Sequence, residues 1–400
     1  MRTIQSLFLA ALAPAFLAGS AAADVASDRA AAIVLFPAVE SQRMVGEDIE
    51  GVAHAVTVDT VIQLSNTSNQ PVQAHCFYVS AVGQCSVSGL GCYEHGDFRC
   101  PSAQDLCLPR WIETDFDVQL TPRQPLAWTV SQGLSPELLP LDGRIFVGPD
   151  GSSNAGTSVP PVPVAIVEPE ETLFETARLF VGELKCIAVD ATGRAVPRNV
   201  LKGEATVVRQ VESFNPDNKD TRQIPVVAKY NGIGIQAIEG DANGDGILEL
   251  GGGSNEYNGC AQTLIAQHNF DGAVVNDLYR TFSTLYLLPC SQDLRLQVPA
   301  ATTTQFLVFN EFEQRFSTSR PVDCFFAEFL SAIDTTQADK SIWSASVAGT
   351  LGGQTRVRGV RTGLIGVLRE ATSQGVEGEA FVHLGLQGDR EQADRIVLPR

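Results

Sequence analysis

The sequence predicts an all-β protein made of two tandem β-sandwich domains. Charged residues make up only 18% of the 400 residues, while the chain holds 35 Gly and 21 Pro, a composition typical of short strands joined by many turns. Hydrophobic residues make up 44%, which is enough to bury two cores in a chain of this length. An internal repeat predicts the number of domains.

Six short motifs occur twice in the same order. One such match would be chance, but six in register predict two copies of one domain. The shared positions are mostly apolar and strand-like, so they are expected to specify folding rather than function. The matched segments are 33–37 with 285–289, the run ending at Asn66 with 305–310, 76–78 with 324–326, Trp128 with Trp343, 180–185 with 364–369, and 203–207 with 378–382.

The repeat divides the chain into four parts. We expect a signal peptide over residues 1–23, a first β-sandwich copy over 24–240, an acidic junction over 241–259 and a second, shorter copy over 260–400. The spacing of strands and turns in each copy is that of immunoglobulin-like sandwiches. Trp128 and Trp343 are expected in the two cores, because each lies in an apolar segment.

The N-terminus has the pattern of an export signal. Arg2 supplies a positive charge, residues 7–18 form a short apolar run, and the alanines at 21–23 supply a cleavage site before Asp24. A membrane-spanning helix needs about 18 or more apolar residues, and this run is shorter. We therefore predict a soluble, exported protein, periplasmic or extracellular, without a membrane span.

Alternating and β-branched segments predict the strands in chain order. Residues 116–120 alternate strictly, which places Phe116, Val118 and Leu120 on one buried face. Helical periodicity is scarce: residues 170–180 favour a short connector helix, and residues 327–333 fit either a strand or a helical turn. The other segments with clear strand patterns are 57–64, 232–238, 305–309 and 354–360.

Three segments have no counterpart in the other copy. They are a cysteine-rich loop over 82–110, a Pro-, Gly- and Ser-rich loop over 149–163, and the segment between the copies at 239–259. Loops held on a rigid scaffold commonly carry binding function. We therefore expect specialised function in these places, with the cysteine-rich loop as the foremost contact surface.

The nine cysteines predict disulfides, because an exported chain meets an oxidising compartment. In the second copy, Cys290 directly follows the first repeated motif and Cys324 begins the central one, so these two are expected to pair. Cys76 then needs another partner, for which Cys186 is the candidate. Since nine is odd, Cys260 is expected to remain a free thiol or an intermolecular partner.

Four further cysteines lie within the loop 82–110 at spacings of seven or eight residues. We expect them to form two bridges in one of three possible connectivities. Together with His95 they could also form a zinc set, but the spacing lacks the usual Cys-x₂-Cys pair, so disulfides are favoured. The four are Cys85, Cys92, Cys100 and Cys107.

The acidic loop 239–249 carries the clearest chemical signal. Three oxygen-bearing side chains fall at alternate positions, so a tight loop can turn all of them inward. This number of hard oxygen ligands suits Ca²⁺ better than Mg²⁺, which demands octahedral geometry and keeps its waters. The prediction is a structural Ca²⁺ at the junction, and the alternative is an acidic turn that binds nothing specifically. The expected ligands are Asp241, Asn243, Asp245, the carbonyl of Ile247, and Glu249.

Residues 241–249 resemble the D-x-N-x-D-G-x-x-[D/E] calcium loops of dockerin, thrombospondin type 3 and FG-GAP repeats. The resemblance covers this loop alone. A full EF-hand has an acid at position 12 of its loop, where this chain has Gly252 within a run of three glycines. We therefore expect a shorter calcium loop flanked by strands.

Common catalytic signatures are missing from the sequence, including those of serine hydrolases, zinc peptidases and nucleotide-binding loops. His75 and His383 lie in predicted strands, where a structural histidine is the usual case. A glycosidase-type acid pair, which meets only in space, would leave no sequence signature. The sequence therefore favours a binding or structural protein over an enzyme, with a secreted hydrolase as the alternative.

The charge excludes some partners. The chain has 46 acidic and 28 basic residues, a net charge of −18, which repels nucleic acid and anionic lipid. We expect an unidentified protein or glycan ligand, at the cell envelope or outside the cell.

Overall fold

The structure is a computed structural model that describes residues 26–47, 53–92, 100, 102, 104–108, 110–134, 157–167, 176–215, 220–275, 279–298, 300–334, 340–373 and 378–399. The expected signal peptide at 1–23 lies outside these residues, as does His95. Among the helices that are described, none is long and apolar enough to span a membrane.

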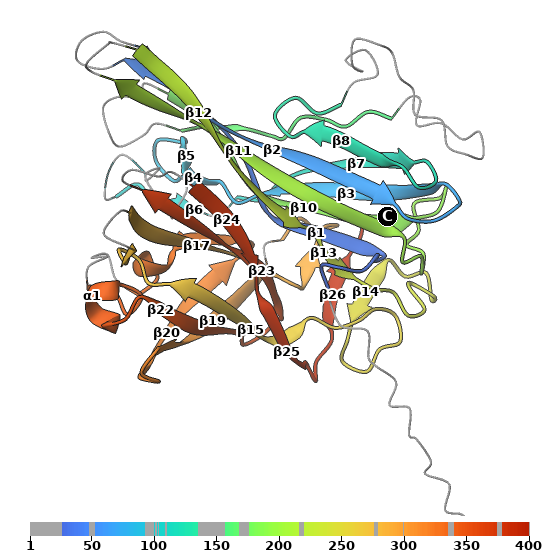
Figure 1. Cartoon of the computed structure of the whole chain (residues 1–400). Helices are drawn as coiled ribbons and strands as arrows, with labels where there is room; N and C mark the ends of the chain where they lie inside the picture. Colours follow the sequence, from blue (N-terminus) through green and yellow to red (C-terminus); the bar gives the residue numbers. More distant parts are fainter. Residues whose placement is uncertain are drawn as a thin grey trace, which may run out of the picture.

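The chain is nearly all-β, as predicted, and its first half forms one large antiparallel sheet (Figure 1). The order of the main strands is β12-β11-β2-β1-β10-β3-β7, while β13, β8 and β9 pair with β1, β2 and β10. The strands are β1 (Ile33–Glu47), β2 (Ala53–Asn66), β3 (Val72–Ser80), β7 (Ile112–Leu120), β8 (Pro125–Thr129), β9 (Ala165–Val167), β10 (Thr176–Val189), β11 (Leu201–Asn215), β12 (Asp220–Asn231) and β13 (Ile233–Ile235).

The second half forms two five-stranded antiparallel sheets. One has the order β20-β19-β22-β15-β25, and the other has the order β16-β17-β23-β24 with β21 on β17. The first contains β15 (Ala261–Asn269), β19 (Ala301–Asn310), β20 (Arg315–Asp323), β22 (Gly352–Gly359) and β25 (Gly385–Asp389). The second contains β16 (Val274–Val275), β17 (Tyr279–Pro289), β21 (Phe326–Phe329), β23 (Leu364–Ser373) and β24 (Gly378–His383).

Smaller elements complete the fold. A three-stranded sheet has the order β14-β26-β18, and another within the cysteine-rich loop has the order β5-β4-β6. Helical elements are few in the described part of the chain and include η2 (Leu330–Ala332) and α1 (Ala345–Ala348). The small-sheet strands are β14 (Ile247–Leu250), β18 (Gln292–Asp293), β26 (Asp394–Val397), β4 (Gly83–Cys85), β5 (Gly91–Cys92) and β6 (Cys107–Leu108).

The sheet that contains β17 and β23 is buried on both faces. Side chains alternate along a strand, so Leu285 and Leu287 enter the core of the second half, whereas Tyr286 and Leu288 enter the core shared with the large sheet. This double burial explains why the segment is a continuous apolar run rather than an alternating one. The molecule therefore has three sheet layers with the β17–β23 sheet in the middle (Figure 1).

A buried ion pair joins the large sheet to this middle layer. Arg369 of β23 contacts both carboxylate oxygens of Glu40 of β1 at 3.2 Å, and the Tyr286 hydroxyl donates to the same carboxylate. The two charged side chains are only 10% exposed. The Arg369 guanidinium also lies over the ring of Tyr286, 5.5 Å from its centroid.

The segments with clear strand patterns at 57–64, 116–120 and 305–309 lie in strands, β22 covers 354–359 of the segment 354–360, and β13 covers 233–235 of the segment 232–238. Trp128 and Trp343 are buried as expected, although Trp343 lies in a turn rather than in a strand. The connector helix expected at 170–180 is wrong from Thr176 onward, because these residues pair with β1; residues 170–175 lie outside the described residues.

The strands that carry the repeated motifs share one pairing. β1 pairs with β10, and β17 pairs with β23 in the same antiparallel sense. The other pairings differ: β3 joins β10, whereas the matching β21 joins β17, and β19 lies in a different sheet from β17. The internal repeat and the immunoglobulin-like topology therefore stay predictions.

Four disulfides are present, as expected for an oxidising compartment. Cys76 pairs with Cys186, and the two residues lie directly opposite each other on β3 and β10. The loop cysteines form two bridges with alternating connectivity. These bridges are Cys85–Cys100 and Cys92–Cys107.

The expected Cys290–Cys324 bridge is wrong, and so is the expectation that Cys260 is free. Cys290, directly after β17, pairs with Cys260, directly before β15. Cys324 is a buried free cysteine. The chain turns at Cys324 with a φ of 64°, and the charges of Glu183 and Lys185 on the large sheet act on its thiol, so this cysteine belongs to the interface between the layers.

Candidate functional site

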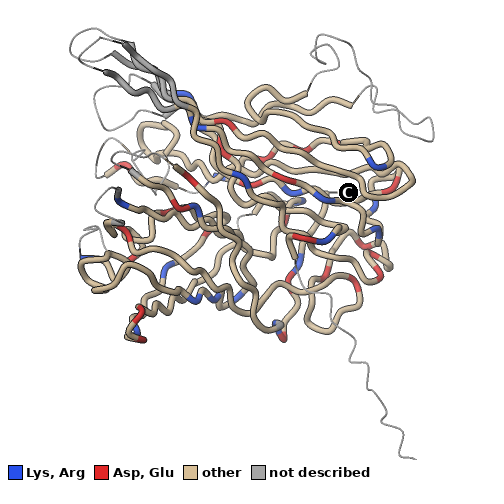
Figure 2. The backbone as a smooth tube through the Cα atoms, in the orientation of Figure 1, with Lys and Arg blue, Asp and Glu red and all other residues tan. Residues whose placement is uncertain are grey.

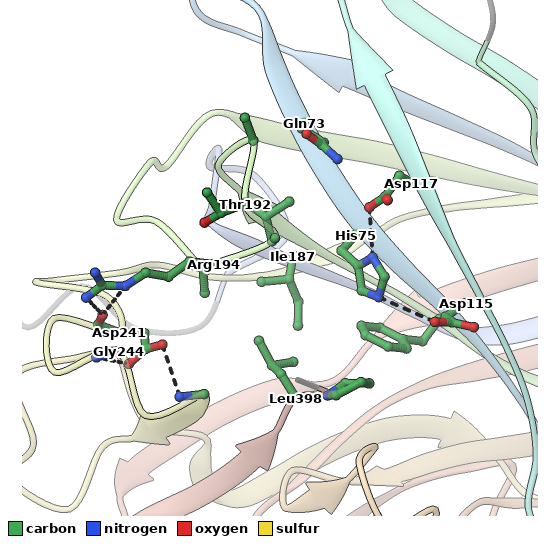
Figure 3. A pocket seen from close by; sticks show the side chains of 17 residues that line it. Gln73, His75, Asp115, Asp117, Ile187, Thr192, Arg194, Asp241, Gly244 and Leu398 are labelled. Atoms are coloured by element: carbon green, nitrogen blue, oxygen red, sulfur yellow. Dashed lines mark hydrogen bonds and ion pairs between the residues drawn. The ribbon is translucent and has the colours of Figure 1, made fainter.

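A groove of about 760 Å³ opens on one face of β10, β3 and β7 (Figure 3). Its floor follows from strand alternation. Gln73 and His75 project from β3 to this face, opposite Val189 and Ile187 of β10, while the intervening Ala74 is buried in the core. On β7, Asp115 and Asp117 are exposed toward the groove because Phe116 between them is buried.

His75 lies between two carboxylates. Its Nδ1 is 2.8 Å from Oδ1 of Asp117, and its Nε2 is 3.8 Å from Oδ2 of Asp115. The carboxylates are more than half exposed, and the imidazole is about a quarter exposed. The ring packs edge-on against Phe77, with 4.5 Å between centroids. Both ring nitrogens therefore face acids, which fixes the orientation of the imidazole.

The walls of the groove come from segments far apart in the sequence. One is the turn after β10, another is the acidic loop after β13, and a third is Leu398 near the C-terminus (Figure 3). Arg194 of the turn ties the first two walls together, because its guanidinium donates to the carbonyl of Asp241 at 2.7 Å and to that of Ala242 at 2.9 Å.

The acidic loop is organised around Asp241. This side chain is only 3% exposed, and its Oδ1 accepts hydrogen bonds from the backbone N–H groups of Gly244 at 2.9 Å and Asp245 at 3.2 Å. Its Oδ2 accepts from the N–H of Gly246 at 3.2 Å. Gly244 and Gly246 have φ values of 71° and 74°, the left-handed conformation that glycine adopts without strain. The loop therefore forms a tight turn around the Asp241 carboxylate.

Asn243 and Asp245 face each other across this turn. The Asn243 amide donates to Oδ2 of Asp245 at 3.0 Å, and Oδ1 of Asp245 accepts from the N–H of Ile247 at 2.8 Å. Ile247 begins β14, which confirms the strand on the C-terminal side of the loop. These contacts bring Asp241, Asn243 and Asp245 together.

Glu249 has a different environment from the other predicted ligands. Its carboxylate pairs with Arg395 of β26 at 2.9 Å, on the partly exposed side of β14. A further acid lies close by: burial raises the pKa of Glu256, and so do the charges of Asp241, Glu249 and Asp245. The loop therefore concentrates negative charge that a bound cation would neutralise.

The cysteine-rich loop is held by its two bridges and by Asp105. The Asp105 carboxylate accepts from the N–H groups of Val87 at 2.7 Å and Ser88 at 3.1 Å. Val87, Leu106 and Leu108 are 76%, 62% and 49% exposed. The role of this loop as a contact surface stays a prediction. Within the loop 149–163, the structure describes residues 157–163, and Val159 pairs with Leu134.

His268 and His383 fit structural roles. Burial lowers the pKa of His268 to about 4, and its Nε2 lies 2.8 Å from the hydroxyl of Thr355, which also accepts from the indole of Trp343. Burial likewise lowers the pKa of His383. Sequence reasoning missed the importance of His75, because the alternation of 116–120 places Asp115 and Asp117 outward without showing which strand lies beside them.

Acidic and basic residues are interspersed over both halves of the molecule (Figure 2). Comparisons with protein-family models, with curated proteins and with solved structures find no match to this chain. Function therefore has to be inferred from the groove and the acidic loop.

Proposed function

We propose that this chain is an exported, disulfide-stapled binding protein that holds a calcium ion in the loop 241–249 and a glycan in the adjoining groove. One observation carries the proposal: the acidic loop and the His75–Asp115–Asp117 set line the same groove. Pockets that combine apolar walls with a few convergent polar groups are the usual ligand sites of proteins.

The chemistry of the groove suits a polyhydroxylated ligand. The carboxylates of Asp115 and Asp117 accept hydrogen bonds, while the amide of Gln73 both donates and accepts. Ile187 and Leu398 supply apolar surface for the carbon faces of a sugar ring. An uncharged glycan that both donates and accepts can satisfy these groups without bringing a second negative charge to an acidic site.

Calcium would act on this groove through the position of the loop. Asp241, Gly244 and Gly246 are all wall residues, so a cation that fixes the turn also fixes the wall. Asp241, Asn243 and Asp245 are the residues that would hold it, with Glu256 as an additional nearby carboxylate. Bound Ca²⁺ would supply rigidity and charge neutralisation rather than reaction chemistry.

The calcium part is tested by calorimetric titration of Ca²⁺ into the mature, oxidised protein. We expect one binding event that Asp245→Ala removes. A matched control is Glu204→Ala, which deletes an exposed carboxylate on β11 that pairs with Lys229. Absence of binding to the parent protein, or unchanged binding by Asp245→Ala, would overturn the calcium site.

The groove is tested on an array of defined oligosaccharides with and without Ca²⁺. We expect selective binding that Asp117→Asn weakens by at least about tenfold, since a lost charge-assisted hydrogen bond costs about 1.5–3 kcal/mol. Glu204→Ala again serves as the control. Equal binding by Asp117→Asn and the parent protein would place the ligand elsewhere.

A secreted hydrolase remains the second candidate, because a histidine and two carboxylates converge in an open groove. In a nucleophile–base pair one ring nitrogen faces the nucleophile, whereas both nitrogens of His75 face acids. This arrangement favours a binding protein over a hydrolase. Turnover of chromogenic ester or glycoside substrates that is lost in His75→Ala would decide for the enzyme.

Export is proposed on two grounds. Residues 1–23 have the pattern of a signal peptide, and the four disulfides fit an oxidising compartment. N-terminal sequencing of secreted protein tests it, with Asp24 as the expected first residue.

A further inference from the structure

A lysine, a glutamate and a glutamine meet in the interface between the large sheet and the small sheet of β14, β26 and β18. Glu183 and Lys185 project from the same face of β10, since they lie two residues apart, and each is only 1% exposed. Gln292 of β18 covers them and is 2% exposed. Burying charged groups so completely costs free energy of desolvation, which the contacts within the cluster have to offset.

The amide of Gln292 lies between the amine and the carboxylate. Its Oε1 contacts Nζ of Lys185, and its Nε2 donates to Oε1 of Glu183. The Lys185 Nζ is 4.0 Å from the same carboxylate oxygen. The other oxygen of Glu183 is buried without a hydrogen-bond partner. The amine therefore lies at the amide oxygen, and the carboxylate lies at the amide nitrogen.

This environment favours the neutral, nucleophilic form of the lysine. Burial lowers the pKa of Lys185, although the charge of Glu183 opposes the shift. The nearby thiol of Cys324 is a weaker competitor, because burial and the charge of Glu183 raise its pKa. Exclusion of water from the cluster also protects the amide from hydrolysis.

We propose that Lys185 and Gln292 form an intramolecular isopeptide bond, with Glu183 as the proton carrier. The lone pair of the neutral Nζ attacks Cδ of Gln292 and forms a C–N bond. Glu183 accepts a proton from Nζ and delivers it to Nε2, the bond from Cδ to Nε2 breaks, and ammonia leaves. Nζ keeps one hydrogen as a secondary amide, and no oxidant or cofactor takes part. Fixed proximity of the reacting groups replaces an external catalyst.

The bond would have a structural purpose. It joins residues that are 107 positions apart and links the central strand β10 to β18 in the second half of the chain. A cross-link of this kind withstands reduction, unlike the four disulfides. The inference is independent of the proposed calcium and glycan sites.

Mass spectrometry tests the proposal on the full mature chain, oxidised during export, then denatured, reduced and alkylated. We expect an intact mass about 17 Da below the value calculated from the sequence, the mass of one ammonia. Trypsin should leave Lys185 uncut and release residues 179–194 covalently joined to residues 281–295. Lys185→Met and Glu183→Gln should each restore the full calculated mass.

The control is Lys229→Met, which removes an exposed lysine of β12 and should keep the mass deficit. A parent protein with the full calculated mass, cleaved after Lys185, overturns the proposal without reference to any variant. A deficit that maps to succinimide at an Asn-Gly pair, or a cross-link from Gln292 to the fragment carrying Cys324, overturns it as well.

Discussion

The buried pair of Glu40 and Arg369 gives the sharpest prediction about stability. Replacing Arg369 by Met keeps most of the side-chain volume but removes the cation that faces Glu40 across the layers. Of the two described groups that hydrogen-bond the carboxylate, only the Tyr286 hydroxyl then remains. The variant therefore leaves a buried charge without its hydrogen-bonded counter-ion.

The expected cost follows from the geometry. Opposite unit charges 3.2 Å apart attract by about 5 kcal/mol at an effective dielectric constant of about 20. Removing one partner of a buried pair costs about 3–5 kcal/mol, because the remaining charge stays desolvated. The double variant Glu40→Gln with Arg369→Met should recover most of this loss, since an apolar or neutral replacement of the whole pair is often close to neutral.

The pH dependence adds a second readout. Burial alone would raise the pKa of Glu40, but Arg369, Arg209 and Tyr286 outweigh it and hold the pKa below its ordinary value of 4.5. The pair therefore stabilises the fold fully above pH 4.5, and its contribution is lost as the pH falls through the lowered pKa. The difference between the parent protein and Arg369→Met should accordingly shrink in acid.

Urea unfolding at pH 7, followed by tryptophan fluorescence with the disulfides intact, measures these free energies. Lys229→Met is the control, because its exposed pair with Glu204 should contribute only about 0–1 kcal/mol. The reasoning would be refuted if Arg369→Met lost no more free energy of unfolding than this control at pH 7. It would also be refuted if the loss at pH 3 were as large as the loss at pH 7.

Three further predictions concern other buried groups. Burial lowers the pKa of His268 from 6.5 to about 4. The free energy of unfolding should therefore be unaffected by this group above pH 6.5 and should fall by about 3 kcal/mol between pH 6.5 and pH 4, because the unfolded chain takes up the proton first. His268→Gln should remove this part of the pH dependence. Replacing both Cys76 and Cys186 by Ala should lower the free energy of unfolding by about 5 kcal/mol, and replacing both Cys260 and Cys290 by about 4 kcal/mol. The first loss is larger because the first bridge closes a loop of 110 residues and the second a loop of 30. Equal denaturation midpoints for the two variants would contradict this order. Cys324 should react with iodoacetamide only after unfolding, since it is buried and its thiol pKa is raised; rapid labelling of the native protein would show that the interface opens.

Much of the fold was predictable from local patterns. The alternation of Phe116, Val118 and Leu120 identified β7 and its buried face, and the clustered cysteines identified a stapled loop. These inferences succeeded because strand burial and short-range bridges depend on residues close in sequence.

The failures involve residues that meet only through the topology. The sequence predicts a Cys290–Cys324 bridge because both residues adjoin repeated motifs of the second copy, but the partner that lies within reach is Cys260, one position before β15. The groove was missed for the same reason: no local pattern shows that β3 and β7 are neighbours or that the acidic loop stands beside them. The sequence did single out Asp241, Asn243 and Asp245, which the fold brings together in one turn.

The most direct test of the proposed function is a histidine NMR spectrum of the mature protein during a Ca²⁺ titration. Because the acidic loop and His75 line one groove, saturable Ca²⁺ binding should shift the His75 resonance and leave buried His268 unchanged, and Asp245→Ala should abolish the shift. A His75 resonance that does not respond to millimolar Ca²⁺ would contradict a calcium-supported ligand groove.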